Sequence, residues 1–91
     1  FENCIIQSHQ GLCYSDKVRL VNCTIVDSDL IFENCINIDA EINGSGFTIK
    51  NPYSGRIKAE KIDKLILDES KIDSSALEII CADILFFQYF L

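Results

Sequence analysis

Apolar and polar residues alternate along several short runs of the chain, so that every second residue shares a face. In LIFEN, for example, Leu30 and Phe32 fall on the same side of an extended segment. The other inward sets are Phe47 with Ile49, Leu65 with Leu67, and Val18 with Leu20 and Asn22. Such runs predict short β-strands with one buried face, because successive side chains of a strand point to opposite sides. Turn-forming residues separate the runs at 8–11, 27–29, 43–46 and 51–55.

The strand pattern returns along the chain with a nearly constant period. One series of similar segments begins at residues 1, 20, 38, 57 and 76, with FENCII, LVNCTI, IDAEIN, IKAEKI and ALEIIC. A second series begins at residues 12, 30, 47, 65 and 85. Two series that share a period of about 18 to 19 residues indicate a solenoid, in which each repeat stacks on the one before it. FENC also recurs at residue 32, but that step aligns few other apolar positions, so we treat it as coincidence.

These repeats predict an all-β fold, a right-handed parallel β-helix of about 4–5 coils with 18–19 residues each. Left-handed β-helices repeat every six residues with small residues at their corners, and no such hexad is visible. Successive coils should stack about 4.8 Å apart, with Leu20, Ile38 and Ile57 in one column. Residues 1–91 are expected to form a single β-helix segment. The chain contains no Met and begins inside the repeat, so we expect it to be a fragment of a longer solenoid.

Asparagine is expected at the corners of the coils. Asn3 and Asn22 occupy the same repeat position, where Asn tolerates a left-handed backbone and stacked side chains can hydrogen-bond each other. Ala40 and Ala59 take that position in the next coils, so the ladder is predicted to end after Asn22. At the end of the second strand, the residues that form a turn ladder are Asp16, Asn34, Asn51 and Glu69.

Composition and charge exclude some classes of partner. The chain is 48% hydrophobic and carries a net charge of -6, so it can bury a core but lacks the clustered Lys and Arg of nucleic-acid binders. No leader resembling a signal peptide is visible. The apolar tail 79–91 is interrupted by Asp83 and Gln88 and is too short to span a bilayer. We therefore expect a cytoplasmic protein with neither nucleic acid nor membrane as partner.

Cysteine and histidine supply no recognisable reactive centre. The chain has five cysteines, at positions 4, 13, 23, 35 and 81, without a C-x-x-C pair. We expect reduced, buried thiols, with Cys4 stacked beside Cys23, although a disulfide between these two stays open. His9 is the only histidine and lies in a turn without a nucleophile beside it. No metal site, cofactor site or catalytic residue is predicted.

The wording of two segments, QGLCYSDKVRLVNCTIVDSDLIFEN and IKNPYSGRI, resembles the C-terminal part of an uncharacterised family of bacterial proteins. Its members look like right-handed β-helices of the pectate-lyase type, and the resemblance covers roughly residues 1 to 75. It implies the same fold and a bacterial cytoplasmic setting. It implies no reaction, because the family is a domain of unknown function.

Carbohydrate chemistry is the alternative that a pectate-lyase-type fold raises. The best carboxylate pair is Glu41 with Glu60, at equivalent repeat positions one coil apart, where a separation near 5 Å would suit a retaining glycosidase. Two solvated surface carboxylates are the plainer interpretation. Arg19, Asn37 and Arg56 should also stack outward, either to hold an acidic ligand or to pair with neighbouring acids such as Asp39.

An apolar stripe is predicted on the outward side of the second strand. Beginning at Cys13, it runs through Ile31, Thr48, Ile66 and Phe86. Something should cover such a stripe, and the candidates are the rest of the chain, a second copy or the tail itself. We therefore expect a non-catalytic structural or interaction module of unknown specific role. The alternative is a carbohydrate-binding or carbohydrate-processing β-helix whose active residues lie outside this segment.

Overall fold

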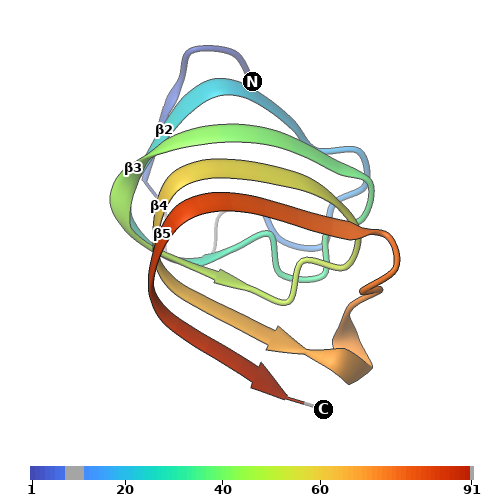
Figure 1. Cartoon of the computed structure of the whole chain (residues 1–91). Coiled ribbons are helices and arrows are strands. Elements are labelled where there is room, and N and C mark those ends of the chain that lie inside the picture. Colours follow the sequence, from blue (N-terminus) through green and yellow to red (C-terminus); the bar gives the residue numbers. More distant parts are fainter. Residues whose placement is uncertain (8–11, 91) are drawn as a thin grey trace.

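The computed structural model describes residues 1–7 and 12–90, and within them almost every regular element is a strand (Figure 1). The elements are β1 (Ile5–Ile6), β2 (Arg19–Ile31), β3 (Ile38–Lys50), β4 (Gly55–Asp68), the single 3-10 turn η1 (Glu69–Lys71) and β5 (Leu77–Phe90). The strands form one sheet in the order β1-β2-β3-β4-β5, and all their pairings are parallel. The predicted parallel β-solenoid is confirmed, with about four turns.

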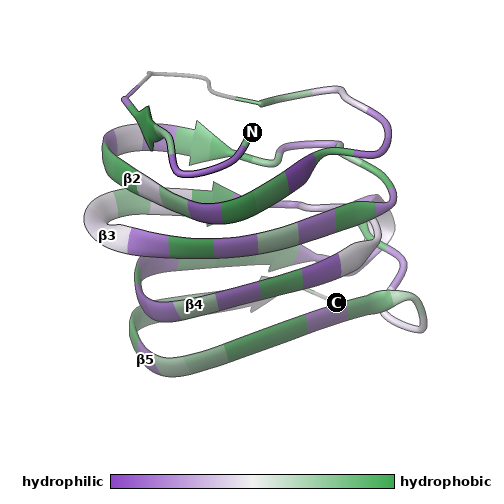
Figure 2. Ribbon diagram, turned by 90° about the horizontal axis from the view of Figure 1, so that it is seen from above, coloured by the Kyte–Doolittle hydropathy of each residue, from purple (hydrophilic) through white to green (hydrophobic). Residues whose placement is uncertain are grey.

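Each long strand supplies two sides of a coil, because it bends in its middle. In Figure 1, β2 to β5 run across the top, turn at the left and return below, and each coil lies nearer the viewer than the last. Figure 2 shows the same coils stacked from the N-terminal end to β5. This winding is right-handed, as expected for crossovers between parallel strands.

Coil length is less regular than the sequence repeats suggested. Arg19, Asp39, Arg56 and Glu78 form one row across four strands, although they are 20, 17 and 22 residues apart. The adjacent inward row joins Leu20, Ala40, Ile57 and Ile79. The expectation that Ile38 stacks between Leu20 and Ile57 was therefore wrong, since Ile38 pairs with Gly55. Loops at the corners absorb the difference, and η1 lies in the longest step.

The core is one apolar column inside the coils. Most of the inward residues that the period-two pattern predicted are buried, namely Val18, Leu20, Phe32, Phe47, Ile49, Leu65 and Leu67. Leu30 is only half-buried, and Asn22 is exposed, contrary to the prediction. Asn22 adopts φ = 52° at a corner, and this left-handed residue breaks the alternation. Cys23 consequently takes the inward position and is fully buried.

The corner asparagines form the predicted ladder, and it is longer than predicted. Asn22 Nδ2 donates to Asn3 Oδ1 at 2.8 Å, and Asn43 Nδ2 donates to Asn22 Oδ1 at 3.2 Å. The third rung is Asn43 rather than Ala40, because β2 and β3 shift register between Leu20 and Cys23. This shift could not be seen in an alignment that assumed one fixed period.

A second corner closes the other side of the coils. Asn34 and Asn51 both have positive φ there, and the Asn34 amide donates to the Asn51 carbonyl at 3.0 Å. In the next coil the partner is Asp68, whose amide donates to Asn51 Oδ1 at 2.8 Å. The predicted ladder through Glu69 is thus shifted by one residue, since Glu69 already belongs to η1.

Candidate functional site

The end of the solenoid at β5 differs from its middle. Among the described strands β5 pairs only with β4, so its other backbone edge is free. The row partners Ile57 and Ile79 illustrate the effect, because Ile57 is fully buried and Ile79 is half-buried. The other inward residues of this strand that pack against the core yet remain partly exposed are Leu77, Cys81 and Ile84. The free end of the core is therefore apolar.

A cavity of about 220 Å³ opens at this end, between β4, the loop after η1, and β5. Leu65 and Ile72 line its inner wall, and Phe87 and Tyr89 line its rim. The two rim rings stack with their centroids 6.3 Å apart, and 52% of Phe87 is exposed. The Tyr89 hydroxyl donates to the Glu69 carboxylate, and this hydrogen bond raises the pKa of Tyr89 above its ordinary value. The rim is thus held in place by a contact with η1.

Charged residues on the outward faces form rungs of alternating sign. Wherever two charged residues are register partners in the described strands, the charges are opposite: Arg19–Asp39, Asp39–Arg56, Arg56–Glu78, Glu41–Lys58 and Lys61–Asp83. Two of these rungs are ion pairs, with Arg19 Nε 3.9 Å from Asp39 Oδ2 and Arg56 Nε 3.6 Å from Glu78 Oε1. Such exposed pairs stabilise by only about 0.2–1 kcal/mol each, so their main effect is on register.

This row corrects one expectation about the outward basic residues. Asn37 was predicted to stack between Arg19 and Arg56, but that position belongs to Asp39. Asn37 lies at a corner, where its Nδ2 donates to Asp16 Oδ1 at 2.9 Å. Arg19 pairs with Asp39, as the plainer interpretation proposed, so its guanidinium already has an acidic partner.

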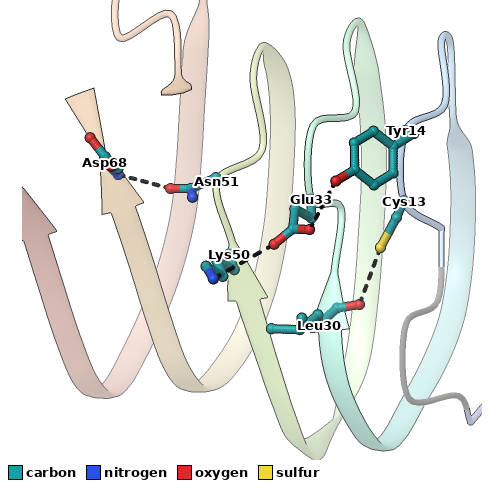
Figure 3. A network of polar contacts seen from close by, with 7 residues as sticks. All are labelled: Cys13, Tyr14, Leu30, Glu33, Lys50, Asn51 and Asp68. Carbon is teal, nitrogen blue, oxygen red and sulfur yellow. Dashed lines mark hydrogen bonds and ion pairs between the residues drawn. The ribbon is translucent and has the colours of Figure 1, made fainter. Parts of the chain in front are cut away.

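Figure 3 shows a polar network on the opposite side of the coils. Glu33 lies at its centre, with Oε1 3.5 Å from the Tyr14 hydroxyl and Oε2 3.8 Å from Lys50 Nζ. Nearby, the Cys13 thiol donates to the Leu30 carbonyl at 3.7 Å, and burial raises the pKa of that thiol. At the far end, hydrogen bonds from Ser70 lower the pKa of Asp68. These contacts join neighbouring coils, so the polar groups of the network have a structural role.

The carboxylate pair Glu41 and Glu60 is not arranged as predicted. The register partner of Glu41 is Lys58, and Glu60 lies two positions further along β4. Both carboxylates are exposed and border a surface hollow of about 320 Å³, which also includes Lys58 and Ile80. None of the described residues that line this hollow is aromatic. A lysine beside the carboxylates and the offset of two residues distinguish the arrangement from the predicted equivalent pair.

The predicted apolar stripe is not continuous. Ile31 is 1% exposed and belongs to the core, because it pairs with Ile49 inside the coils. Thr48 and Phe86 do share an outward row, but Lys64 lies between them with Nζ 5.5 Å from the centre of the Phe86 ring. Ile66 belongs to a different row, between Lys50 and Gln88. The bend in each strand reverses the alternation, which placed Ile31 on the wrong face.

The five cysteines are free thiols. Cys23 and Cys35 are buried, whereas Cys4, Cys13 and Cys81 are half-buried. Cys35 donates to the Leu12 carbonyl at 2.6 Å, and burial is the main cause of the raised pKa of its thiol. His9 lies outside the described residues. Within the described part of the chain, no three His, Cys, Asp or Glu side chains cluster as metal ligands would.

None of the helical structure in residues 1–7 and 12–90 is long and apolar enough to cross a membrane.

The features of the β5 end were not predicted from the sequence for two reasons, one of register and one of exposure. The fixed period aligned Ala76 with Ile57, whereas Ile79 is the true partner, three residues later. With that offset corrected, the signal is visible in the sequence: Glu78 and Asp83 have the same spacing as Arg56 and Lys61 and the opposite charge. The half-exposed row follows only from the absence of a strand beyond β5 among those described.

Comparison with known families identifies the chain over most of its length. Residues 1–80 match the family described as "Protein of unknown function (DUF3737)", and the chain therefore belongs to this family. The searches of curated proteins and of solved structures gave no match. The family match agrees with the predicted membership of an uncharacterised family, and it assigns no reaction.

Proposed function

We propose that this DUF3737 protein is a non-catalytic β-solenoid scaffold that binds another polypeptide through the apolar end formed by β5. The observation that carries the proposal is the half-exposed inward row of this strand. Ile79 and Ile84 pack on buried partners, Ile57 and Ile62, from one side, and no described strand covers them on the other. An exposed apolar surface beside a free strand edge is a typical site for polypeptide association.

Carbohydrate binding finds no comparable support. Glu41 and Glu60 are offset in register, and Lys58 lies beside Glu41. The Arg19–Asp39–Arg56–Glu78 row consists of charges that neutralise one another, so it offers no free basic surface for an acidic sugar. The pectate-lyase-type likeness and the bacterial, cytoplasmic setting stay predictions. Titration with oligosaccharides, followed by calorimetry, tests the carbohydrate alternative directly.

Two adjacent phenylalanines allow a matched test of the proposed surface. Phe86 is 50% exposed and Phe87 is 52% exposed, but Phe86 lies on the outward row beside Lys64 and Phe87 lies at the rim of the open core. The neutral dye Nile red should fluoresce on the wild-type chain, because it partitions into accessible apolar surface. Phe87→Gln should lower this fluorescence strongly, and Phe86→Gln should leave most of it unchanged.

The reverse ranking would contradict the proposal, because it would place the accessible apolar surface on the outward row that contains Phe86. Equal fluorescence of wild type and both variants would also contradict it. Circular dichroism on each variant shows whether the fold is retained, so a loss of fluorescence through unfolding can be recognised.

A further inference from the structure

We propose that the free edge of β5 binds an extended, basic, amphipathic segment of a partner protein, which adds to the solenoid as a parallel strand. The inference rests on the proposed function and specifies the chemistry of its partner. Three features of β5 carry it: a free backbone edge, a half-exposed apolar row, and two acidic side chains at a defined spacing.

The backbone edge determines the mode of binding. A strand at the edge of a sheet presents unpaired N–H and C=O groups, and an extended peptide satisfies them by β-augmentation. Every pairing between the described strands is parallel, so the inward row of β5 has the geometry that accepts a parallel neighbour. Side chains at alternate positions of the added strand would cover Ile79 and Cys81, and one would enter the cavity beside Phe87.

The charges determine the sequence of the partner. Glu78 pairs with Arg56, and Asp83 is the register partner of Lys61, but in both cases β4 contacts only one side of the carboxylate residue. The side chain of Glu78 remains 66% exposed, and Asp83 is also exposed. The alternation of sign along the coils therefore calls for a base in the strand after each of them. Since the two acids are five residues apart, the two bases should be five residues apart as well.

The strand β4 already has this pattern. Arg56 and Lys61 carry the bases, with Ile57, Ala59 and Ile62 as the buried residues between and after them. The predicted partner motif is therefore base, apolar, any, apolar, any, base, apolar. This spacing fits both the acidic outward positions and the apolar inward positions of β5 at once.

A second copy of the chain fits the edge less well. Pairing of β5 with another β5 would bring Glu78 and Asp83 of both copies together, and Leu77–Phe90 contains no Lys or Arg. Stacking the first coil of another copy on β5 would present residues 1–7, which also contain no Lys or Arg. Neither segment supplies a Lys or Arg side chain to the acidic positions.

A peptide with the sequence of residues 55–68 is the probe. Labelled with fluorescein, it should bind the 91-residue chain, measured by fluorescence anisotropy, and bind more weakly as salt is raised. A control peptide carries R56D, E60K, K61E and D63R, which exchange charges and leave composition and net charge unchanged. We expect the control to bind about tenfold more weakly, because both outward rungs then join like charges.

Chain variants provide the reciprocal test. Glu78→Lys with Asp83→Lys should reverse the preference, so that the control peptide binds better than the original one. Maleimide labelling gives an independent readout, since the added strand covers Cys81 and leaves Cys4, at the other end of the solenoid, as an internal control. The original peptide should slow the labelling of Cys81 only.

Three results would overturn the inference. They are equal binding of the two peptides, no binding of either, and self-association that protects Cys81 without peptide. The last result would make a second copy the occupant and would leave the proposed function intact. If neither peptide binds but Nile red fluorescence still depends on Phe87, the partner chemistry is wrong and the apolar end surface stands. If Nile red fluorescence is the same with and without the Phe87 side chain, the proposed function itself is wrong.

Discussion

The coil of β4 and the coil of β5 bear the same inward pattern and differ in burial. Ile57 and Ile62 are fully buried, whereas their register partners Ile79 and Ile84 are only half-buried. Cys23 and Cys81 repeat the difference, since they belong to one row and only Cys23 is buried. For inward residues of one row, burial is therefore decided by whether coils lie on both sides.

The largest test of this comparison replaces two row partners in turn. Ile57→Ala should lower the free energy of unfolding by about 2–5 kcal/mol, because it removes a fully buried side chain and leaves a cavity. Ile79→Ala should cost less than half as much, since its site is already open on one side. Urea denaturation followed by circular dichroism measures both values. Equal losses would show that the β5 end is as well covered as the middle.

A backbone substitution should produce the next largest effect. Gly55 begins β4 with φ = 122°, and a Cβ there would lie 2.2 Å from the Ile38 carbonyl oxygen. Gly55→Ala should cost more than about 1–3 kcal/mol, the range expected for backbone strain alone. Gly46→Ala is the control, because its Cβ would meet mainly a movable Asp27 carboxylate oxygen at 2.8 Å. In thermal unfolding, the melting temperature of Gly55→Ala should be well below that of Gly46→Ala. The opposite ranking would contradict the coil spacing described.

The asparagine ladder joins the first three coils through Asn3, Asn22 and Asn43, and its contribution to stability should be intermediate. Asn22→Ala loses hydrogen bonds to Asn3 and Asn43 and places alanine at φ = 52°. We expect a loss of about 1–2 kcal/mol in unfolding free energy, from the left-handed backbone and two exposed hydrogen bonds. Asn22→Gly removes the same bonds without backbone strain, so it should be less harmful than Asn22→Ala. If the glycine variant is the less stable of the two, the backbone explanation is wrong.

The charge rungs should have the smallest effect on stability. Arg56→Glu faces Asp39 and Glu78 on either side, so it replaces two favourable rungs by two repulsive ones. Each exposed pair accounts for about 0.2–1 kcal/mol, and the loss should shrink as salt is raised. Arg19→Glu affects one described charged rung, with Asp39, and should cost about half as much. Melting temperatures at low and high salt check this; a salt-independent loss would indicate a packing effect instead.

The sequence predicted the fold well and the surface only in part. The alternation within single strands correctly predicted the inward residues Phe47, Ile49, Leu65 and Leu67, because alternation within one strand is a local property. Ile31 was placed on the wrong face, since bends and left-handed corners interrupt the alternation. The Asn3–Asn22 contact was predicted, and its extension to Asn43 was missed because the coils differ in length.

The candidate site was predicted only in outline. The sequence showed that the tail 79–91 is apolar, but the row through Ile79, Cys81 and Ile84 and the acidic positions Glu78 and Asp83 were not identified. The alignment of one coil with the next was wrong by two or three residues, and this error was enough to hide both the apolar row and the acidic positions. A pair such as Glu41 and Glu60 shows the same sensitivity, because a shift of two positions replaced a carboxylate neighbour by Lys58.

The sequence by itself determined the strand class, the approximate period and the left-handed asparagines, since each depends on neighbouring residues and on the conformations they allow. Only the tertiary structure decided which residues of different coils are partners and which face of the last coil stays open. Register partners in neighbouring coils are 16 to 22 positions apart in the sequence, across corners of unequal length. No local pattern encodes those lengths, because a corner loop can absorb extra residues without disturbing the rows that it connects.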